Sequence, residues 1–341
     1  MKAQPVSRLQ YIFSSRKTVI GIGLILFSII VTIILIPILT PFFAVQFAPE
    51  KIAQASQSDL AKQASFTFWE NFHAGNYDKI PDIRFLLTAA YVENPNDPQI
   101  ALLLAHTHLW SLAERDREAQ DPLITDHAIL AERYFSEAAR LTPEDARIPG
   151  WLGSVKLALG SIHQDEKATR EGYFMLKEAV ELWPEFNNFT AGFAVSGLAA
   201  DSDIYQEGLA YQWHNIDVCI ESTGESIDRT HPDYSSYLVL ETTTGPKRTC
   251  WNSTIAPHNF EGFFLNMGDM LLKNGDTEAA THIYQIAQLS PDYDSWPYKS
   301  VLEARLTNLD SLAQQFLTAD LESQPEIMFN SSYNCMACHQ K

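Results

Sequence analysis

The segment from Phe264 to Pro291, FLNMGDMLLKNGDTEAATHIYQIAQLSP, decides the fold of this chain. Its apolar and small residues recur three and four positions apart in two stretches, which is typical of amphipathic helices. Between the stretches stands Gly275, where a left-handed backbone conformation costs a glycine little. Two antiparallel helices need small residues where they cross, and Gly268 and Ala280 meet that need. The segment therefore predicts a helical hairpin.

The spacing within this hairpin resembles the tetratricopeptide repeat, a family of stacked helix pairs. The matching positions are Phe264, Met267, Gly268, Leu271, Gly275, Ala280, Tyr284 and Ala287. Only the closing proline departs from the pattern, because it arrives one residue early. Weaker copies upstream, such as Ala131, Phe135, Ala138 and Pro143, extend the resemblance to four repeats at 58–96, 97–145, 146–186 and 259–292. The resemblance implies an all-α superhelix whose groove docks protein partners.

The segment 187–258 between the third and fourth repeats is predicted to be an insertion that becomes an irregular loop from Cys219 onward. Turn-forming residues dominate it, and Tyr234–Glu241 could form a short strand. A disulfide between Cys219 and Cys250 is the simplest assignment, with two separate buried thiols as the alternative. A four-cysteine zinc site is less favoured because the spacing of the pairs is uneven. The region 259–322 then holds the fourth repeat and one amphipathic capping helix.

The C-terminal tail, 323–341, carries the pentad Cys335-Met336-Ala337-Cys338-His339. This C-x-x-C-H pattern resembles the attachment site of c-type haem. The resemblance implies one covalent haem c, with Cys335 and Cys338 forming thioethers and His339 serving as an axial iron ligand. Because only two residues follow the pentad, one face of the haem must be covered by earlier residues of the chain, by a partner subunit or by solvent. We expect an exposed haem on a short arm, with an arm that folds back onto the superhelix as the alternative.

The sixth iron ligand is left open by the sequence. Met328 is near the pentad in sequence, and His258 and His282 lie in or beside the last repeat, so these three are candidates. An open coordination position is the alternative. The sequence contains no G-x-S-x-G, H-E-x-x-H or phosphate-loop motif, so an electron carrier or scaffold is favoured over an enzyme.

The N-terminus predicts a membrane anchor. Residues 18–49 carry no charge, and 18–42 are apolar enough for a transmembrane helix. The leader 1–17 is basic, which predicts a cytoplasmic N-terminus and a periplasmic bulk at a bacterial inner membrane. A cleaved signal peptide ending at Ala53-Gln54-Ala55 is the alternative. The net charge of −18 argues against nucleic acid as a partner and suits a protein with a basic patch.

Together these features predict a membrane-anchored, periplasmic c-type monohaem cytochrome. Its tetratricopeptide-like scaffold would dock a redox protein or a membrane complex, and its C-terminal haem would transfer electrons. The alternative is a scaffold protein without haem, in which Cys335 and Cys338 form a disulfide or a redox pair.

Overall fold

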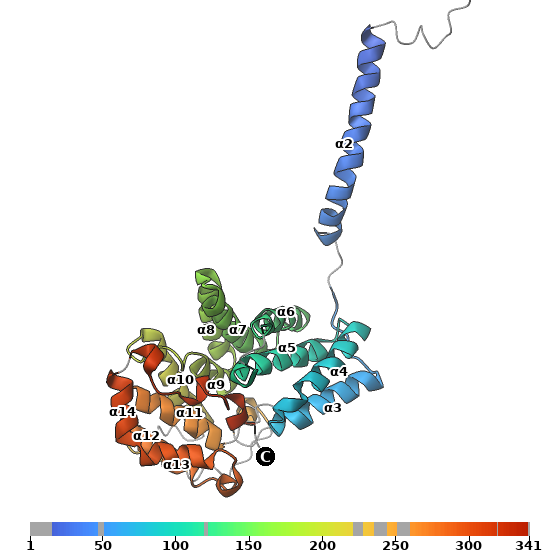
Figure 1. Ribbon diagram of the computed structural model, residues 1–341. Coiled ribbons are helices and arrows are strands. Elements are labelled where there is room, and N and C mark those ends of the chain that lie inside the picture. The colour runs from blue at the N-terminus through green and yellow to red at the C-terminus, as the bar shows by residue number, and fades with distance from the viewer. Residues whose placement is uncertain are drawn as a thin grey trace, which may run out of the picture. The chain divides into compact units, whose positions relative to one another are not determined.

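The computed structural model describes residues 16–46, 51–118, 122–220, 228–234, 244–250, 260–318 and 320–339. All regular secondary structure within these ranges is helical, so the prediction of an all-α chain is confirmed. The chain divides into two units, residues 1–52 and residues 53–341 (Figure 1). Each unit is described by itself.

The first unit contains one helix, α2 (Arg16–Gln46). Within it, the stretch Ile20–Pro37 is long and apolar enough to cross a membrane by length and composition. The helix continues through Pro37 and Pro41 and ends beyond the predicted limit of residue 42. It is therefore a candidate membrane span.

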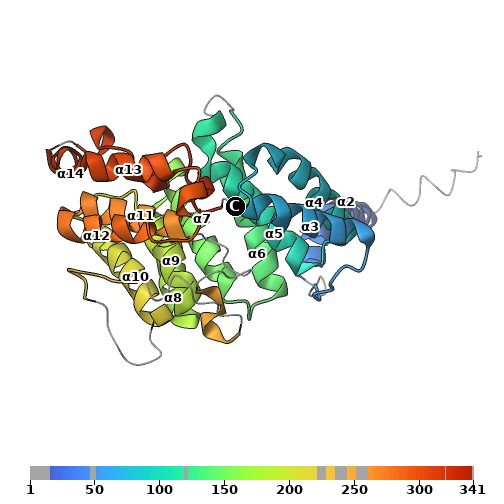
Figure 2. The same ribbon diagram turned by 90° about the horizontal axis from the view of Figure 1, so that it is seen from below.

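The second unit is built from helices that pack against their neighbours along the chain (Figures 1 and 2). Each of the four ranges that resemble a repeat holds two helices. They are α3 (Asp59–His73) with α4 (Ile80–Glu93), α5 (Pro98–Ala113) with α6 (Asp126–Leu141), α7 (Arg147–His163) with α8 (Glu166–Leu182), and α11 (Phe260–Lys273) with α12 (Thr277–Ala287).

Short polar side chains start several of these helices. The carboxylates of Asp97, Asp165 and Asp276 accept backbone N–H groups in the first turns of α5, α8 and α12. Such caps satisfy donors that have no partner inside the helix. Gly275, at the turn between α11 and α12, has a φ of +85°, as its position in the sequence predicts.

Small residues lie where paired helices cross. A Cβ atom on Gly153 of α7 would meet the carbonyl oxygen of Gly172 on α8 at 2.9 Å. On α11, a Cβ atom on Gly268 would overlap the ring of Tyr284 on α12. These backbones can approach so closely only because the side chain is absent.

A fifth helix pair occupies the start of the expected insertion. It consists of α9 (Pro184–Ala194) and α10 (Asp203–Ile220), which pack against each other and precede α11. Gly192 and Gly208 lie at their crossing. The helical part of the expected insertion therefore runs to Ile220, close to Cys219, where the sequence predicts that the irregular loop begins.

A disulfide joins Cys219, at the end of α10, to Cys250, with their Cα atoms 5.6 Å apart. The turn before Cys250 also contacts the helical stack: the indole Nε1 of Trp183 donates to the carbonyl of Pro246 at 2.9 Å. The Arg248 guanidinium lies 4.1 Å from the centre of the same indole. Apart from Tyr234, the strand predicted for Tyr234–Glu241 lies outside the described residues.

The predicted capping helix is two short helices, α13 (Lys299–Thr307) and α14 (Leu309–Thr318), which meet at Asn308. In the described part of the tail that follows, residues 320–339, the regular structure consists of 3-10 turns, among them η7 (Cys335–Ala337). Figure 2 shows this tail between α5 on one side and α11 and α13 on the other.

Candidate functional site

The end of the C-terminal tail, from Asn334 to His339, is largely buried inside the second unit. Met336 belongs to the hydrophobic core formed with α3, α4 and α5, whereas Met328, Ala337 and Cys338 belong to the core around α11 and α12. Only 3% of Cys338 and 4% of His339 are exposed. The expectation of an exposed arm is therefore wrong. Burial of the tail's apolar residues between the α3–α5 helices and the α11–α12 helices is favourable, because it removes apolar surface from water.

Two buried carboxylates hold the backbone of the tail. Glu114, directly after α5, accepts the N–H of Met336 at 2.9 Å through Oε1. Asp269, on α11, accepts the N–H of Met328 at 2.8 Å. The indole of Trp296 donates to the carbonyl of Ala337 at 3.0 Å. These contacts orient the turn that carries the cysteines.

The two carboxylates differ in their electrostatic surroundings. Burial raises the pKa of Glu114 to about 7, although the Met336 N–H and the Arg117 guanidinium partly offset this. Asp269 lies 3.0 Å from the Nε of Arg305 and accepts the hydroxyl of Tyr284 at 2.6 Å. Its charge raises the pKa of Arg305. Asp269 is therefore part of a buried ion pair, whereas Glu114 is a buried carboxyl that exchanges its proton near pH 7.

Both cysteines of the pentad are thiols in the structure. Burial raises the pKa of Cys338, and burial together with the Glu114 carboxylate raises the pKa of Cys335. A thiol must ionise to act as a nucleophile in disulfide exchange. In this folded form the pair is therefore poorly suited to exchange.

Cys335, Cys338 and His339 line one apolar cleft with aromatic side chains from other helices. The aromatic side chains are Phe72 from α3, Trp110 from α5, Trp151 from α7, and Phe189 and Phe193 from α9. The rings of His339 and Phe72 are 4.1 Å apart between centres. The cavity volume is about 40 Å³, so a porphyrin would have to push these rings apart.

The three sequence candidates for the sixth iron ligand differ in whether they line the cleft. Met328 lines the cleft, whereas His282 lies on α12 and does not line it. His258 lies outside the described residues. His106, on α5, lines the cleft although the sequence reasoning did not single it out. Its signal was the two histidines, His106 and His108, within one apolar helical run.

Gly262 brings α11 into close contact with the pentad. A Cβ atom at this position would lie 2.5 Å from the Ala337 carbonyl oxygen and 2.6 Å from the Cys338 Sγ atom. The absence of a side chain at Gly262 therefore allows the cysteine turn to lie against the helix.

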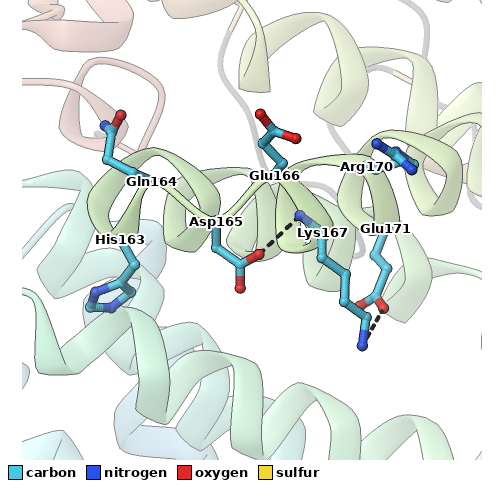
Figure 3. A pocket seen from close by; sticks show the side chains of 7 residues that line it. All are labelled: His163, Gln164, Asp165, Glu166, Lys167, Arg170 and Glu171. Atoms are coloured by element: carbon cyan, nitrogen blue, oxygen red, sulfur yellow. Dashed lines mark hydrogen bonds and ion pairs between the residues drawn. The ribbon is translucent and has the colours of Figure 1, made fainter.

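A second hollow, open to solvent, lies at the turn between α7 and α8 (Figure 3). Its charged side chains already have local partners: Asp165 caps α8, and Lys167 pairs with Glu171 at 3.6 Å. The charged side chains of this hollow therefore have a structural role, in helix capping and ion pairing. The apolar cleft, where the pentad lies, is therefore the candidate functional site.

No family model, no curated protein and no solved structure matches this chain. The candidate site therefore depends on the residues and their geometry alone.

Proposed function

We propose that this chain is a membrane-anchored c-type monohaem cytochrome that transfers electrons to or from a protein partner. The observation that carries the proposal is that Cys335, Cys338 and His339, the three residues of the attachment pattern, all line one apolar cleft. Haem c supplies the one-electron chemistry when it is bound.

The residues around the cleft suit a covalently held haem. Cys335 and Cys338 supply the two sulfur atoms for thioether bonds, and His339 supplies an imidazole beside them. The aromatic side chains around the cleft would exclude water from the haem. The low local dielectric would raise its reduction potential, because it disfavours the more highly charged ferric state. The side chains that line the cleft come from α3, α5, α7, α9 and the tail itself, so a haem bound there would have helices beside it.

Two side chains in the cleft can supply the sixth ligand, Met328 and His106. Replacing each by leucine separates the possibilities, because loss of a ligand changes the visible spectrum and the reduction potential. Loss of a methionine ligand would lower the potential. Spectra unchanged in both variants would show that the iron has no sixth ligand from these residues.

The helical stack supports a docking role. The pairing of consecutive helices and the small residues at their crossings agree with a tetratricopeptide-like superhelix, which binds partners along its surface. The net charge of −18 favours a partner with a basic patch. With α2 as the anchor and a cytoplasmic leader, the second unit would lie in the periplasm of a bacterial inner membrane.

The decisive experiment is expression of the full chain in a bacterial strain that matures c-type cytochromes. We expect a haem-stained band on a denaturing gel, an intact mass raised by one haem, and a pyridine adduct spectrum of haem c. The matched control, Cys335→Ser with Cys338→Ser, should lack all three signals. A parent protein that has only the mass of its polypeptide would refute the proposal.

That refuting result would favour the alternative, a scaffold protein without haem. The raised pKa of both thiols argues against a redox-active pair in this alternative. A double-cysteine variant that still captured its partner would then identify the helical stack as the functional part.

A further inference from the structure

A second cluster of metal-ligating side chains lies away from the cleft. His231, from the described segment 228–234, meets Glu278 and His282 of α12, and one ligand atom from each of the three lies within 4.8 Å of the others. Glu278 and His282 are four residues apart on one helix, so they share a face. Two imidazoles and a carboxylate form a ligand set used by Zn²⁺.

The distances within the cluster suit a metal ion. The Nε2 atom of His231 lies 3.3 Å from the Oε1 atom of Glu278. Two ligands of a tetrahedral zinc with bonds of about 2.1 Å are separated by roughly 3.4 Å. The ligand atoms of the other two residue pairs lie at most 4.8 Å apart, so each pair must approach by no more than about 1.4 Å to reach this separation. Rotation of exposed side chains can provide such a shift.

Neighbouring residues orient the imidazole of His231. Its Nδ1 atom lies 3.1 Å from the hydroxyl oxygen of Thr230, and that hydroxyl donates to Asp228 at 2.6 Å. Because the hydroxyl proton is used by Asp228, the oxygen can accept the Nδ1–H of His231. With the Nδ1–H directed to Thr230, the Nε2 atom, which faces Glu278, is the ring nitrogen that can bind a metal ion. Metal-binding histidines are commonly oriented by such an acceptor behind the ring.

We propose that His231, Glu278 and His282 bind one Zn²⁺ ion, with water in the fourth position. The ion would join the segment 228–234 to α12. This segment lies between Cys219 and Cys250 in sequence, so the metal would hold the disulfide-closed loop at a second point. The site is independent of the haem proposal, because none of its ligands lines the cleft.

The test is a ZnCl₂ titration of the full chain in detergent micelles by calorimetry, with no histidine tag. Cys335→Ala with Cys338→Ala serves as the parent, so that free thiols do not bind zinc. We expect one Zn²⁺ per chain and a rise in the unfolding temperature. His282→Ala and Glu278→Gln should each weaken binding at least about tenfold, and Thr230→Val should weaken it by roughly tenfold.

The matched control is His163→Ala, which removes an exposed histidine at the last position of α7 and should leave zinc binding unchanged. If the parent without free thiols loses its helical circular dichroism, the wild-type chain and its His282→Ala variant are compared instead, because their thiols are identical. Equal affinity in the parent and in His282→Ala would overturn the proposal, as would a parent that binds no zinc.

Discussion

The carboxylate of Glu114 accepts the backbone N–H of Met336 across a sequence separation of 222 residues, at 2.9 Å. This hydrogen bond joins the end of α5 to the centre of the C-x-x-C-H pentad. It shows that the N-terminal helices help to position the cysteines at the other end of the chain, so substitutions far from the pentad in sequence should change the site.

Glu114→Ala should destabilise the second unit by about 1–3 kcal/mol, because it leaves the buried N–H of Met336 without an acceptor. The free energy of unfolding from urea titrations measures this change. Glu118→Ala is the control, since Glu118 is exposed in the turn directly after α5. Equal stability of the two variants would show that the Glu114 contact contributes nothing.

Titration of Glu114 should make stability fall as the pH rises. The pKa of this carboxyl is about 7 in the folded chain and 4.5 as its ordinary value. The folded state therefore binds more protons between pH 4.5 and 7, and a contribution on the order of 3 kcal/mol is lost across this window. Glu114→Gln should remove this loss. Urea titrations of both proteins at pH 5 and pH 8 provide the measurement, and parallel pH profiles would contradict the expectation.

Gly262→Ala should displace the cysteine turn, because the added methyl group would overlap the Ala337 carbonyl and the Cys338 sulfur. In the chain without haem, maleimide should label Cys338 faster, and haem attachment should decrease in a maturation-competent strain. Gly268→Ala is the matched control, since it strains the packing of α11 on Tyr284 without touching the tail. Both variants should lose stability, but only Gly262→Ala should expose the thiol.

Asp269→Asn should cost about 3–5 kcal/mol of stability, because it leaves the charged guanidinium of Arg305 buried without its counter-ion. The tail should loosen as well, since Asp269 also accepts the N–H of Met328. Thermal unfolding followed by circular dichroism measures the loss. Asp310→Asn, at an exposed position of α14, should leave the midpoint unchanged. A similar midpoint in both variants would argue against the buried pair.

Replacing Cys219 and Cys250 together by serine should destabilise the chain by about 3–4 kcal/mol, because the disulfide closes a loop of 31 residues in the unfolded state. Reduction of the parent should have the same effect. Urea titrations with and without reductant compare the two. A parent whose midpoint is insensitive to reductant would show that the bond contributes little.

The sequence by itself determined the helical class, the candidate membrane span, the pairing of Cys219 with Cys250 as the simplest disulfide, and the chemistry that the pentad can support. The disulfide follows from the two cysteines outside the pentad, and the other conclusions depend on local periodicity, apolar length or residue types at fixed spacing. Such signals lie within a few turns of chain. For the same reason Gly275 could be placed at the turn between α11 and α12.

Only the tertiary structure decided where the tail lies, which residues surround it and how its charges are balanced. The contacts of Met336 with Glu114, of Cys338 with Gly262 and of His231 with Glu278 join distant parts of the chain. No local pattern encodes such pairs, because they form when apolar surfaces on separate helices are buried together. Burial also raises the pKa values of Glu114 and of the two thiols. The sequence suggested an exposed arm, whereas in the structure the pentad lines an apolar cleft.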